Sequence, residues 1–307
     1  MLTIIPFNST PDLHFNMTLW LYVPEGEAPF PAIIKVSSDG TGSQTQINQT
    51  IVDRGYIFAC YNHTALDPDT GGYDVDGPAQ KAYPNYDWGS LGVWAWGAMR
   101  IADLLVGESW VAGAGDFSSH KVDTEKLIVT GHSRRGKTAL LAAAYDERFA
   151  MVVPNGSGCG GCGSFLVQGP FSETIKMITS EKRFKSWFHE DFGKYGGNEE
   201  ALPFDQHFIR ALIAPRYIIS TDGLQDYWAN PTGTKAVHEA SQPVFDFLNA
   251  SDNNGIHYRD GGHGFLQEDF AVLLNFADKM LLGKNISDDF YMDPFDEDFP
   301  IEYSIPK

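Results

Sequence analysis

The sequence predicts an α/β protein: one doubly wound, mostly parallel sheet with helices on both faces, giving a three-layer sandwich. Short apolar runs such as PAIIKV at 31–36 are typical of parallel strands that are buried on both faces. These runs alternate with segments of helical periodicity, and the connections between them are mostly short. The chain has 307 residues and 43% of them are hydrophobic, so it can build one large core.

The expected elements follow one another to the end of the chain. Each expected strand is a run of four to six mostly apolar residues, and each expected helix repeats apolar residues every three or four positions. Pro215 should stop the helix that precedes it. The expected strands are 19–23, 31–36, 56–60, 127–130, 150–153, 217–220 and 256–259. The expected helices are 88–105, a segment from the GHSRRGK turn through 144, 209–213, 234–248 and 270–282.

Three stretches break this alternation. Residues 62–84 are polar and rich in Gly, Pro and Asp, which predicts a long loop. Residues 156–170 predict a Gly-rich turn, and 171–203 predict short helices with several aromatic residues. Long loops over the carboxyl ends of strands build the pockets of such folds. We find no repeat or linker that divides the chain, so 1–307 is expected to be a single domain with a loosely packed acidic tail from about 285.

Charge excludes some classes of partner. The chain has 22 Lys and Arg against 40 Asp and Glu, a formal net charge of −18. A field of that sign repels phosphate backbones, so nucleic-acid binding is not expected. No apolar stretch approaches the length of a membrane span. With no strong sign of an interface, we expect a monomer, although the sequence leaves the oligomeric state open.

Glycosylation signals favour an extracellular protein. Asn-x-Ser/Thr sequons are more frequent than this composition requires, which suits the secretory pathway. The N-terminus lacks the features of a signal peptide, so an exported protein would be seen here in its mature form. Coincidence in a bacterial protein is the alternative explanation. The sequons begin at Asn8, Asn16, Asn48, Asn62, Asn155, Asn249 and Asn285.

The cysteines and the glycine motifs predict no cofactor. Cys60, Cys159 and Cys162 are an odd number and form no disulfide framework. The Cys-Gly-Gly-Cys spacing at 159–162 suits zinc or redox chemistry, but no second Cys/His pair stands near it. Two small residues in a Gly-rich turn are the simpler interpretation. The chain also has no G-x-G-x-x-G motif after its first strand and no cluster of metal-ligating residues.

A serine lies directly between an expected strand and the helix that follows it, in GHSRRG at 131–136. A Ser on such a tight turn has its hydroxyl pushed out above the sheet. The first N–H groups of the helix point to the same place and favour a developing oxyanion. The usual motif is G-x-S-x-G, and here the second Gly comes one residue late. Ser133 is therefore a candidate nucleophile, with an ordinary helix N-cap as the alternative.

The residues that follow have the order of an α/β-hydrolase, which is Ser, then acid, then His. His263 lies in GGHGF after the last expected strand, where the general base belongs. Asp222 and Asp226 both follow the strand at 217–220. A Gly, an Asp three residues later and then a Pro favour Asp226 as the triad acid, and Asp222 is the alternative.

At this point the chain resembles the glucuronoyl esterases of carbohydrate esterase family 15. GHSRRGK at 131–137 resembles their G-x-S-R-x-G-K signature. Further similar stretches extend the resemblance from about 19 to 282. They are DWG at 87–89 with WAWG at 94–97 and Arg100, NGSGCGG at 155–161, LPFDQH at 202–207, APR at 214–216 and DYWANP at 226–231.

The resemblance implies a serine esterase that cleaves the ester between 4-O-methyl-glucuronic acid side chains of xylan and lignin alcohols. It implies Ser133 as nucleophile, His263 as base and Arg134 in the oxyanion site. Its expected substrate is thus glucuronoxylan or another uronate ester.

The resemblance also implies sugar-binding residues. Lys137, one helical turn after Ser133, resembles the family lysine that bonds sugar hydroxyls, and its ammonium is expected at the pocket rim. Trp228 resembles a pocket tryptophan, whose indole suits the face of a sugar ring. Glu173 and Glu181 are spaced like a family Gln and Glu that contact the sugar.

The sequence departs from the family pattern in two places. Many fungal members carry the triad acid as a Glu just after the strand that follows the elbow, where this chain has Gly156. That departure resembles the bacterial-type branch and strengthens Asp226. The fungal cysteines beside the Ser and the His are replaced by His132 and Gly264, which leaves simpler esters and other uronates open as substrates.

Two other functions stay open at this point. An acetyl-xylan esterase or another carbohydrate esterase would use the same triad. A non-catalytic carbohydrate-binding relative is a further alternative, although such a protein has no need for Ser, Asp and His in this order.

Overall fold

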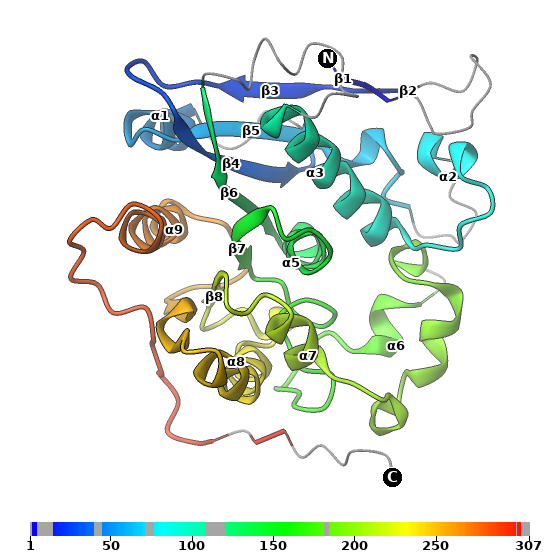
Figure 1. Cartoon of the computed structure of the whole chain (residues 1–307). Helices are drawn as coiled ribbons and strands as arrows, with labels where there is room; N and C mark the ends of the chain where they lie inside the picture. Colours follow the sequence, from blue (N-terminus) through cyan, green and yellow to red (C-terminus); the bar gives the residue numbers. More distant parts are fainter. Residues whose placement is uncertain are drawn as a thin grey trace.

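The structure, a computed structural model, describes residues 2–4, 15–39, 45–70, 77–107, 121–180, 184–298 and 300–301. Its main feature is a seven-stranded sheet (Figure 1). Only the first strand in the sheet order runs antiparallel to its neighbour, and every other neighbouring pair is parallel. The predicted mostly parallel sheet is therefore confirmed. The order is β3 (Leu19–Tyr22), β5 (Ile57–Asn62), β4 (Phe30–Ser37), β6 (Val122–His132), β7 (Phe149–Asn155), β8 (Tyr217–Gly223) and β9 (Asn254–Arg259).

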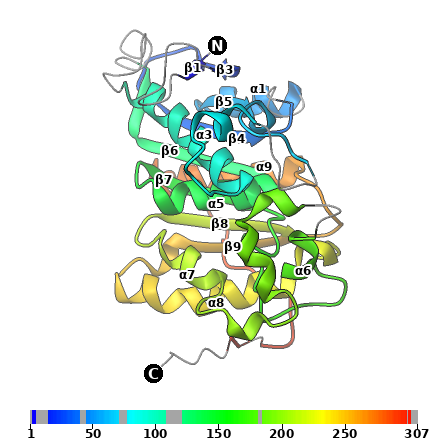
Figure 2. The same ribbon diagram turned by 90° about the vertical axis from the view of Figure 1, so that its right-hand side faces the viewer.

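Helices cover both faces of this sheet, as the sequence predicts (Figures 1 and 2). Alternating strand residues feed two separate apolar cores: in β4, Ile33 faces one core and Ile34 the other. The core around Ile34 is closed by α3 (Ser90–Val106), α5 (Arg134–Tyr145), α7 (Gln206–Ala211) and α8 (Pro231–Phe247). The core around Ile33 is closed by α1 (Thr45–Asp53) and α9 (Gln267–Met280).

Some elements were not expected from the sequence. The only apolar residues that helix α1 buries are Ile47 and Ile51, so its apolar stripe is too narrow to stand out. Helix α2 (Pro78–Ala82) lies in the stretch expected to be a loop, so that prediction is wrong there; Pro78 starts the helix. Strands β1 (Leu2–Ile4) and β2 (Phe15–Met17) form a separate antiparallel pair. The short helices expected in 171–203 are present as α6 (Ile175–Ile178) and 3-10 segments between 185 and 201.

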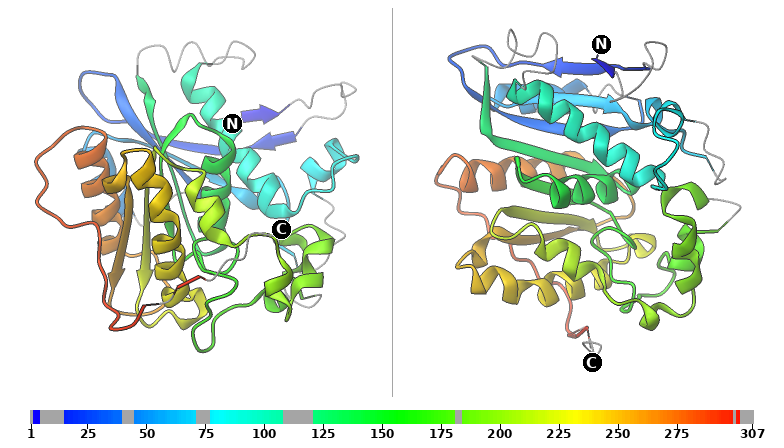
Figure 3. Two further views of the ribbon diagram at one scale, coloured as in Figure 1. Left: turned by 60° about the horizontal axis from the view of Figure 1, so that its bottom comes forward. Right: turned by 45° about the vertical axis from the view of Figure 1, so that its right-hand side comes forward.

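The segment after α9 is bonded to β9 at Phe290 and Met292, so the prediction of a loosely packed tail is wrong there. Most of residues 284–298 are exposed, as in a loose tail. We call these residues the C-terminal strap; Figure 3 shows it in red, leaving α9 and running back toward α8. The Ile256 N–H donates to Phe290 O over 2.7 Å, and the Met292 N–H donates to Ile256 O over 3.0 Å. These bonds satisfy part of the open edge of β9. The Phe290 side chain, only 8% exposed, packs against Phe276.

The acidic residues of the strap have a cationic partner. The Lys235 side chain in α8 is 4% exposed, and its ammonium lies 3.0 Å from an Asp293 carboxylate oxygen. The same ammonium donates to Glu297 O over 3.0 Å. Composition alone indicated a solvated acidic tail because it does not reveal that a buried lysine and an open strand edge face this segment.

The sequons differ in exposure. Asn155 is fully buried in β7 and its amide donates to Thr221, so a folded chain cannot carry a glycan there. Asn48 is also buried, whereas Asn16, Asn249 and Asn285 are exposed. Asn62 is partly buried and Asn8 lies outside the described residues. The extracellular interpretation stays a prediction.

The three cysteines are buried and free. Within the described ranges, no helix is long and apolar enough to cross a membrane. In the same part of the chain, no group of three or more His, Cys, Asp or Glu residues could hold a metal ion.

Removing the Phe290 ring should weaken the strap and the core under α9. We expect Phe290→Ala to lower the free energy of unfolding by about 3–5 kcal/mol, the usual cost of deleting a buried Phe side chain. Denaturant unfolding measures this change. The control is Phe247→Ala, whose side chain is 84% exposed and should matter by less than about 0.5 kcal/mol. Equal effects of the two substitutions would show that the strap is not part of the folded core.

Candidate active site

The site starts at the sharp turn between β6 and α5. Ser133 has φ 60° and ψ −127°, a backbone conformation that a non-glycine residue rarely adopts. The turn is held because the Ser133 N–H donates to Asn155 O over 2.9 Å. Gly136 is needed one turn on, since a Cβ there would lie 3.0 Å from Asn155 O. The glycine that comes one residue late in the motif is thus the residue that lets α5 pack onto β7.

The predicted base and acid meet at the carboxyl edge of the sheet. His263 follows β9 and Asp226 follows β8, and His263 Nδ1 lies 2.6 Å from Asp226 Oδ2. The Asp226 side chain is 3% exposed, whereas that of His263 is 37% exposed. An ionised carboxylate only accepts hydrogen bonds, so Nδ1 carries the proton and Nε2 is left free to take one. The Ala229 N–H donates to the other Asp226 oxygen and fixes the carboxylate.

His132 links this pair to the serine. Its ring centroid lies 4.3 Å from that of His263, so the residue next to Ser133 packs directly on the predicted base. His132 Nδ1 lies 2.6 Å from Asn155 Oδ1, while the side-chain NH₂ of Asn155 donates to Thr221. Burial and the neighbouring His263 lower the pKa of His132 to about 4. His132 therefore stays neutral near pH 7 and adds no second charge beside His263.

The alternative acid, Asp222, has a different environment. It is 1% exposed, and within the described ranges neither carboxylate oxygen has a hydrogen-bond partner. Burial, reinforced by the Asp226 carboxylate, raises its pKa well above the usual range. A carboxyl held in this way binds its proton more tightly than a solvated one. The geometry thus puts Asp226, and not Asp222, on His263.

Gly156 marks the place where fungal relatives were expected to carry the acid. It follows β7, and a Cβ there would lie 3.3 Å from Asp226 Oδ2 and 3.4 Å from His132 Cε1. A carboxylate carried by position 156 would thus start beside the one that Asp226 supplies. The lack of an acid at 156 leaves room for the Asp226 side chain.

The Arg134 side chain is anchored away from free solvent. Its guanidinium pairs with Asp69 and lies over the Trp187 ring, 4.9 Å from the centroid. Trp187 also donates its indole N–H to Asp69 over 3.0 Å. Burial alone would raise the pKa of Asp69, but hydrogen bonds from His63, Trp187 and Arg134 hold it below its usual range. The backbone N–H of Arg134 belongs to the first turn of α5, where N–H groups lack helical partners.

Lys137 does not reach the pocket rim as expected, and that part of the prediction is wrong. Its side chain is 2% exposed, and its ammonium donates to Ser157 O over 2.6 Å and to Cys159 O over 2.7 Å. The third partner is the Glu173 carboxylate, so all three ammonium protons are engaged. Gly158 makes room for this pair, since a Cβ there would collide with Glu173 Oε1. Burial raises the pKa of Glu173, and Lys137 opposes that shift.

The remaining predicted sugar contacts lie close to this ion pair or outside the described residues. The Glu173 N–H donates to Trp228 O over 3.0 Å, so these two residues are neighbours. Trp228 is partly exposed, two residues after Asp226. Glu181 lies outside the described residues.

Sequence reasoning missed several residues that shape this site. Trp187 lies over both Arg134 and Lys137, 5.9 Å from the Lys137 ammonium, and Asp69 pairs with Arg134. Both come from irregular loops far from the elbow in sequence, so no local pattern could identify them. His132 was noticed only as the replacement of a cysteine.

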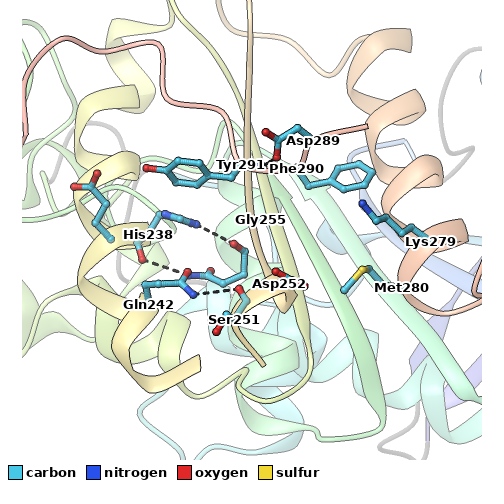
Figure 4. Close-up of a pocket in the computed structure, with 12 residues that line it drawn as sticks. His238, Gln242, Ser251, Asp252, Gly255, Lys279, Met280, Asp289, Phe290 and Tyr291 are labelled. Carbon is cyan, nitrogen blue, oxygen red and sulfur yellow. Dashed lines mark hydrogen bonds between the residues drawn. The ribbon is translucent and has the colours of Figure 1, made fainter. Parts of the chain in front are cut away.

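A cavity of about 650 Å³ lies away from this site (Figure 4). His238, Gly255 and Tyr291 are among its lining residues, from α8, β9 and the strap. Gly255 belongs to the amino end of β9, whereas His263 follows the carboxyl end. This cavity therefore contributes nothing to the triad.

Comparison with known proteins shows the family to which this chain belongs. The family model for fungal glucuronyl esterases matches residues 8–249. This chain belongs to the glucuronoyl esterase family. The chain is 30% identical over 292 residues to a 4-O-methyl-glucuronoyl methylesterase of Hypocrea jecorina, covering 92% of this chain and 59% of that protein. It is 32% identical over 211 residues to the carbohydrate esterase MZ0003 of an unknown prokaryotic organism, covering 64% of this chain and 45% of that protein.

The fold agrees with this membership. A family 15 glucuronoyl esterase from Caldicellulosiruptor kristjansonii superimposes with a TM-score of 0.84 at 30% identity, covering 97% of this chain and 81% of that one. The α/β-hydrolase fold expected from the sequence is therefore confirmed. This member of the family spans 45% to 61% of the length of the first curated relatives. The fungal family model and the Caldicellulosiruptor structure both match, so the bacterial-type branch stays a prediction.

The choice of acid can be tested by two amide substitutions. An amide at 226 can turn its NH₂ group toward His263 Nδ1 and hold the wrong tautomer, so Asp226→Asn should lower kcat about 10²–10⁴-fold. Asp222→Asn should change kcat far less, because the carboxylate that bonds His263 Nδ1 is that of Asp226. Hydrolysis of p-nitrophenyl acetate measures both variants, with thermal unfolding as a check on folding. The reverse order of the two losses would assign the acid to Asp222.

Proposed function

We propose that this chain is a serine esterase. Its proposed substrate is the ester bond that links the 4-O-methyl-glucuronic acid side chains of xylan to lignin alcohols. The observation that carries the proposal is the hydrogen bond between His263 and Asp226, beside the strained turn at Ser133, in a member of this family. Family membership supports the uronate ester, because the Hypocrea relative is a 4-O-methyl-glucuronoyl methylesterase.

In the proposed mechanism Ser133 Oγ attacks the ester carbonyl and its proton passes to His263 Nε2. Asp226 accepts the Nδ1 proton in a hydrogen bond and stabilises the imidazolium. The carbonyl oxygen becomes an oxyanion, which the N–H groups in the first turn of α5 can stabilise. His263 returns the proton to the departing alcohol, which leaves the uronoyl group bound to Ser133 Oγ as an ester. Water then attacks this ester while His263 takes a proton from the water. The proton passes to Ser133 Oγ as the uronic acid leaves.

Arg134 and Lys137 have different proposed roles. Arg134 contributes its backbone N–H and the positive charge that Asp69 and Trp187 hold beside the elbow. Lys137 and Glu173 act as a buried pair that shapes the sugar side of the pocket next to Trp228. Lys137 can bond a sugar hydroxyl only by exchanging one of its present partners. Trp228 offers a ring face, and Glu181 remains a proposed sugar contact.

We also propose the domain organisation, the oligomeric state and the location of this enzyme. We propose that residues 1–307 act as one catalytic domain, as a monomer, outside the cell on glucuronoxylan. Exposed sequons at Asn16, Asn249 and Asn285 support an extracellular site of action. The net charge of −18 supports a substrate other than nucleic acid.

The nucleophile can be tested with two substrates. Wild type should hydrolyse benzyl glucuronate with a higher kcat/KM than p-nitrophenyl acetate, because only the first has the sugar. Ser133→Ala should lose about 10⁴-fold or more on both while its unfolding temperature stays close to wild type. Activity near wild type in Ser133→Ala would remove the serine mechanism. Acetate hydrolysis without glucuronate hydrolysis would favour an acetyl esterase.

The buried ion pair tests the sugar side of the pocket. Removing Lys137 alone would leave Glu173 as an unpaired buried charge, so both should be neutralised together in Lys137→Met/Glu173→Gln. We expect kcat/KM on benzyl glucuronate to fall about 10- to 100-fold, the worth of one charged hydrogen bond. Hydrolysis of p-nitrophenyl acetate, which has no sugar, should change by less than about threefold. An equal loss on both substrates would mean that the pair only supports the elbow.

A further inference from the structure

The loop that carries His263 accepts hydrogen bonds from the side chain of Arg259. Arg259 is the last residue of β9, and its side chain is 1% exposed. Its Nη2 group donates to Gly262 O over 3.1 Å and to Gly264 O over 2.7 Å. These are the carbonyls on either side of His263. A third bond runs from Nη1 to Asp260 O over 3.0 Å.

The other end of Arg259 is fixed to a helix. Its Nε donates to Asp269 Oδ2 over 2.9 Å, and Asp269 is fully buried in the first turn of α9. The same carboxylate oxygen accepts the Leu266 N–H over 2.7 Å and so caps the helix. Two buried opposite charges in this geometry hold one position, because separating them would leave an uncompensated charge. The fork of Arg259 therefore transmits the position of α9 to the His263 loop.

The loop is rich in glycine, and its other bonds in the described residues run to Gln225 and Asp226. His263 is flanked by Gly262 and Gly264, and Gly261 has φ 100°, a conformation open mainly to glycine. Glycines leave a loop many backbone conformations, so its order must come from bonds to the surroundings. On the side of Asp226, the Gln225 N–H donates to Gly261 O over 3.0 Å. Arg259 supplies the bonds on the opposite side.

We propose that Arg259 is a positioning residue that sets the reach of His263 toward Ser133 by holding the carbonyls of Gly262 and Gly264. This role requires the guanidinium: a planar fork can donate to both carbonyls and to Asp269 together, whereas a lysine ammonium is a single point. The inference rests on the proposed esterase function. Its competitor is a purely structural role, in which Arg259 only neutralises buried Asp269.

The test compares the same substitution at two arginines. Arg259→Lys keeps the charge beside Asp269 but cannot hold both loop carbonyls. Arg216→Lys is the matched control, because Arg216 also donates to backbone carbonyls, at 2.8 Å to Phe149 O and 3.1 Å to Leu212 O, at the opposite end of the sheet. We expect Arg259→Lys to lower kcat on benzyl glucuronate about 10- to 100-fold, since small misplacements of a catalytic group cost that much. KM should stay within about threefold, and Arg216→Lys should keep the wild-type kcat.

A spectroscopic measurement separates positioning from stability. The His263 Nδ1 proton, held by Asp226, should give a low-field resonance in the proton NMR spectrum without any substrate. Labelling the histidines with ¹⁵N identifies this resonance. We expect this resonance in wild type and in Arg216→Lys, and its broadening or loss in Arg259→Lys at a temperature where the protein is folded. An unchanged resonance together with a normal kcat would overturn the proposal. So would a loss of activity that follows only the unfolded fraction.

A second variant keeps the test valid if Arg259→Lys does not fold. Arg259→Gln/Asp269→Asn removes both charges together, so no buried charge is left unpaired, and Asn can still accept the Leu266 N–H. The same loss of kcat and of the resonance is expected, and wild-type values of both would overturn the proposal. If wild type hydrolyses neither ester, the proposed function fails, while the resonance still decides whether Arg259 orders the loop.

Discussion

The arrangement of the site depends on the parallel pairing of β6, β7, β8 and β9. Parallel strands bring their carboxyl ends to one edge of a sheet. Ser133 follows β6, Gly156 follows β7, and Asp226 and His263 lie three and four residues after the ends of β8 and β9. Because these connections are short, the register of the four strands decides whether the side chains meet. A slip of one strand by a residue would move each of its side chains into the opposite core. Packing in the two cores therefore fixes the strand register on which the site depends.

Charge pairing is the second level of organisation. Three cations around the site each pair with an acid from another element: Arg134 with Asp69, Lys137 with Glu173, and Arg259 with Asp269. At such burial an unpaired charge is costly, so each pair fixes the segment that carries it. Trp187 then covers two of the cations, Arg134 and Lys137. Each of these three cations is thus matched by an acid, although the chain as a whole carries an excess of acid.

The space around the Asp226 carboxylate is limited by position 156. A side chain at Gly156 would begin beside the Asp226 carboxylate, so strands β7 and β8 can each deliver an acid to the same place. What must be conserved physically is a carboxylate against His263 Nδ1, and the chain position of that carboxylate is secondary. The neutral His132 ring, packed on His263, fills the space on the other side.

The sequence by itself determined the seven strands of the main sheet, most of its helices and the order Ser133, Asp226, His263, because apolar period and turn residues are local signals. It also determined the family, through motifs spread from about 19 to 282. Only the tertiary structure decided that Lys137 is buried against Glu173 and that the acidic strap is bound by Lys235. The same holds for the bonds from Arg259 to the carbonyls around His263. These results depend on which segments face one another in the folded chain. The local sequence around a charged residue does not show whether water solvates the charge or a buried partner neutralises it.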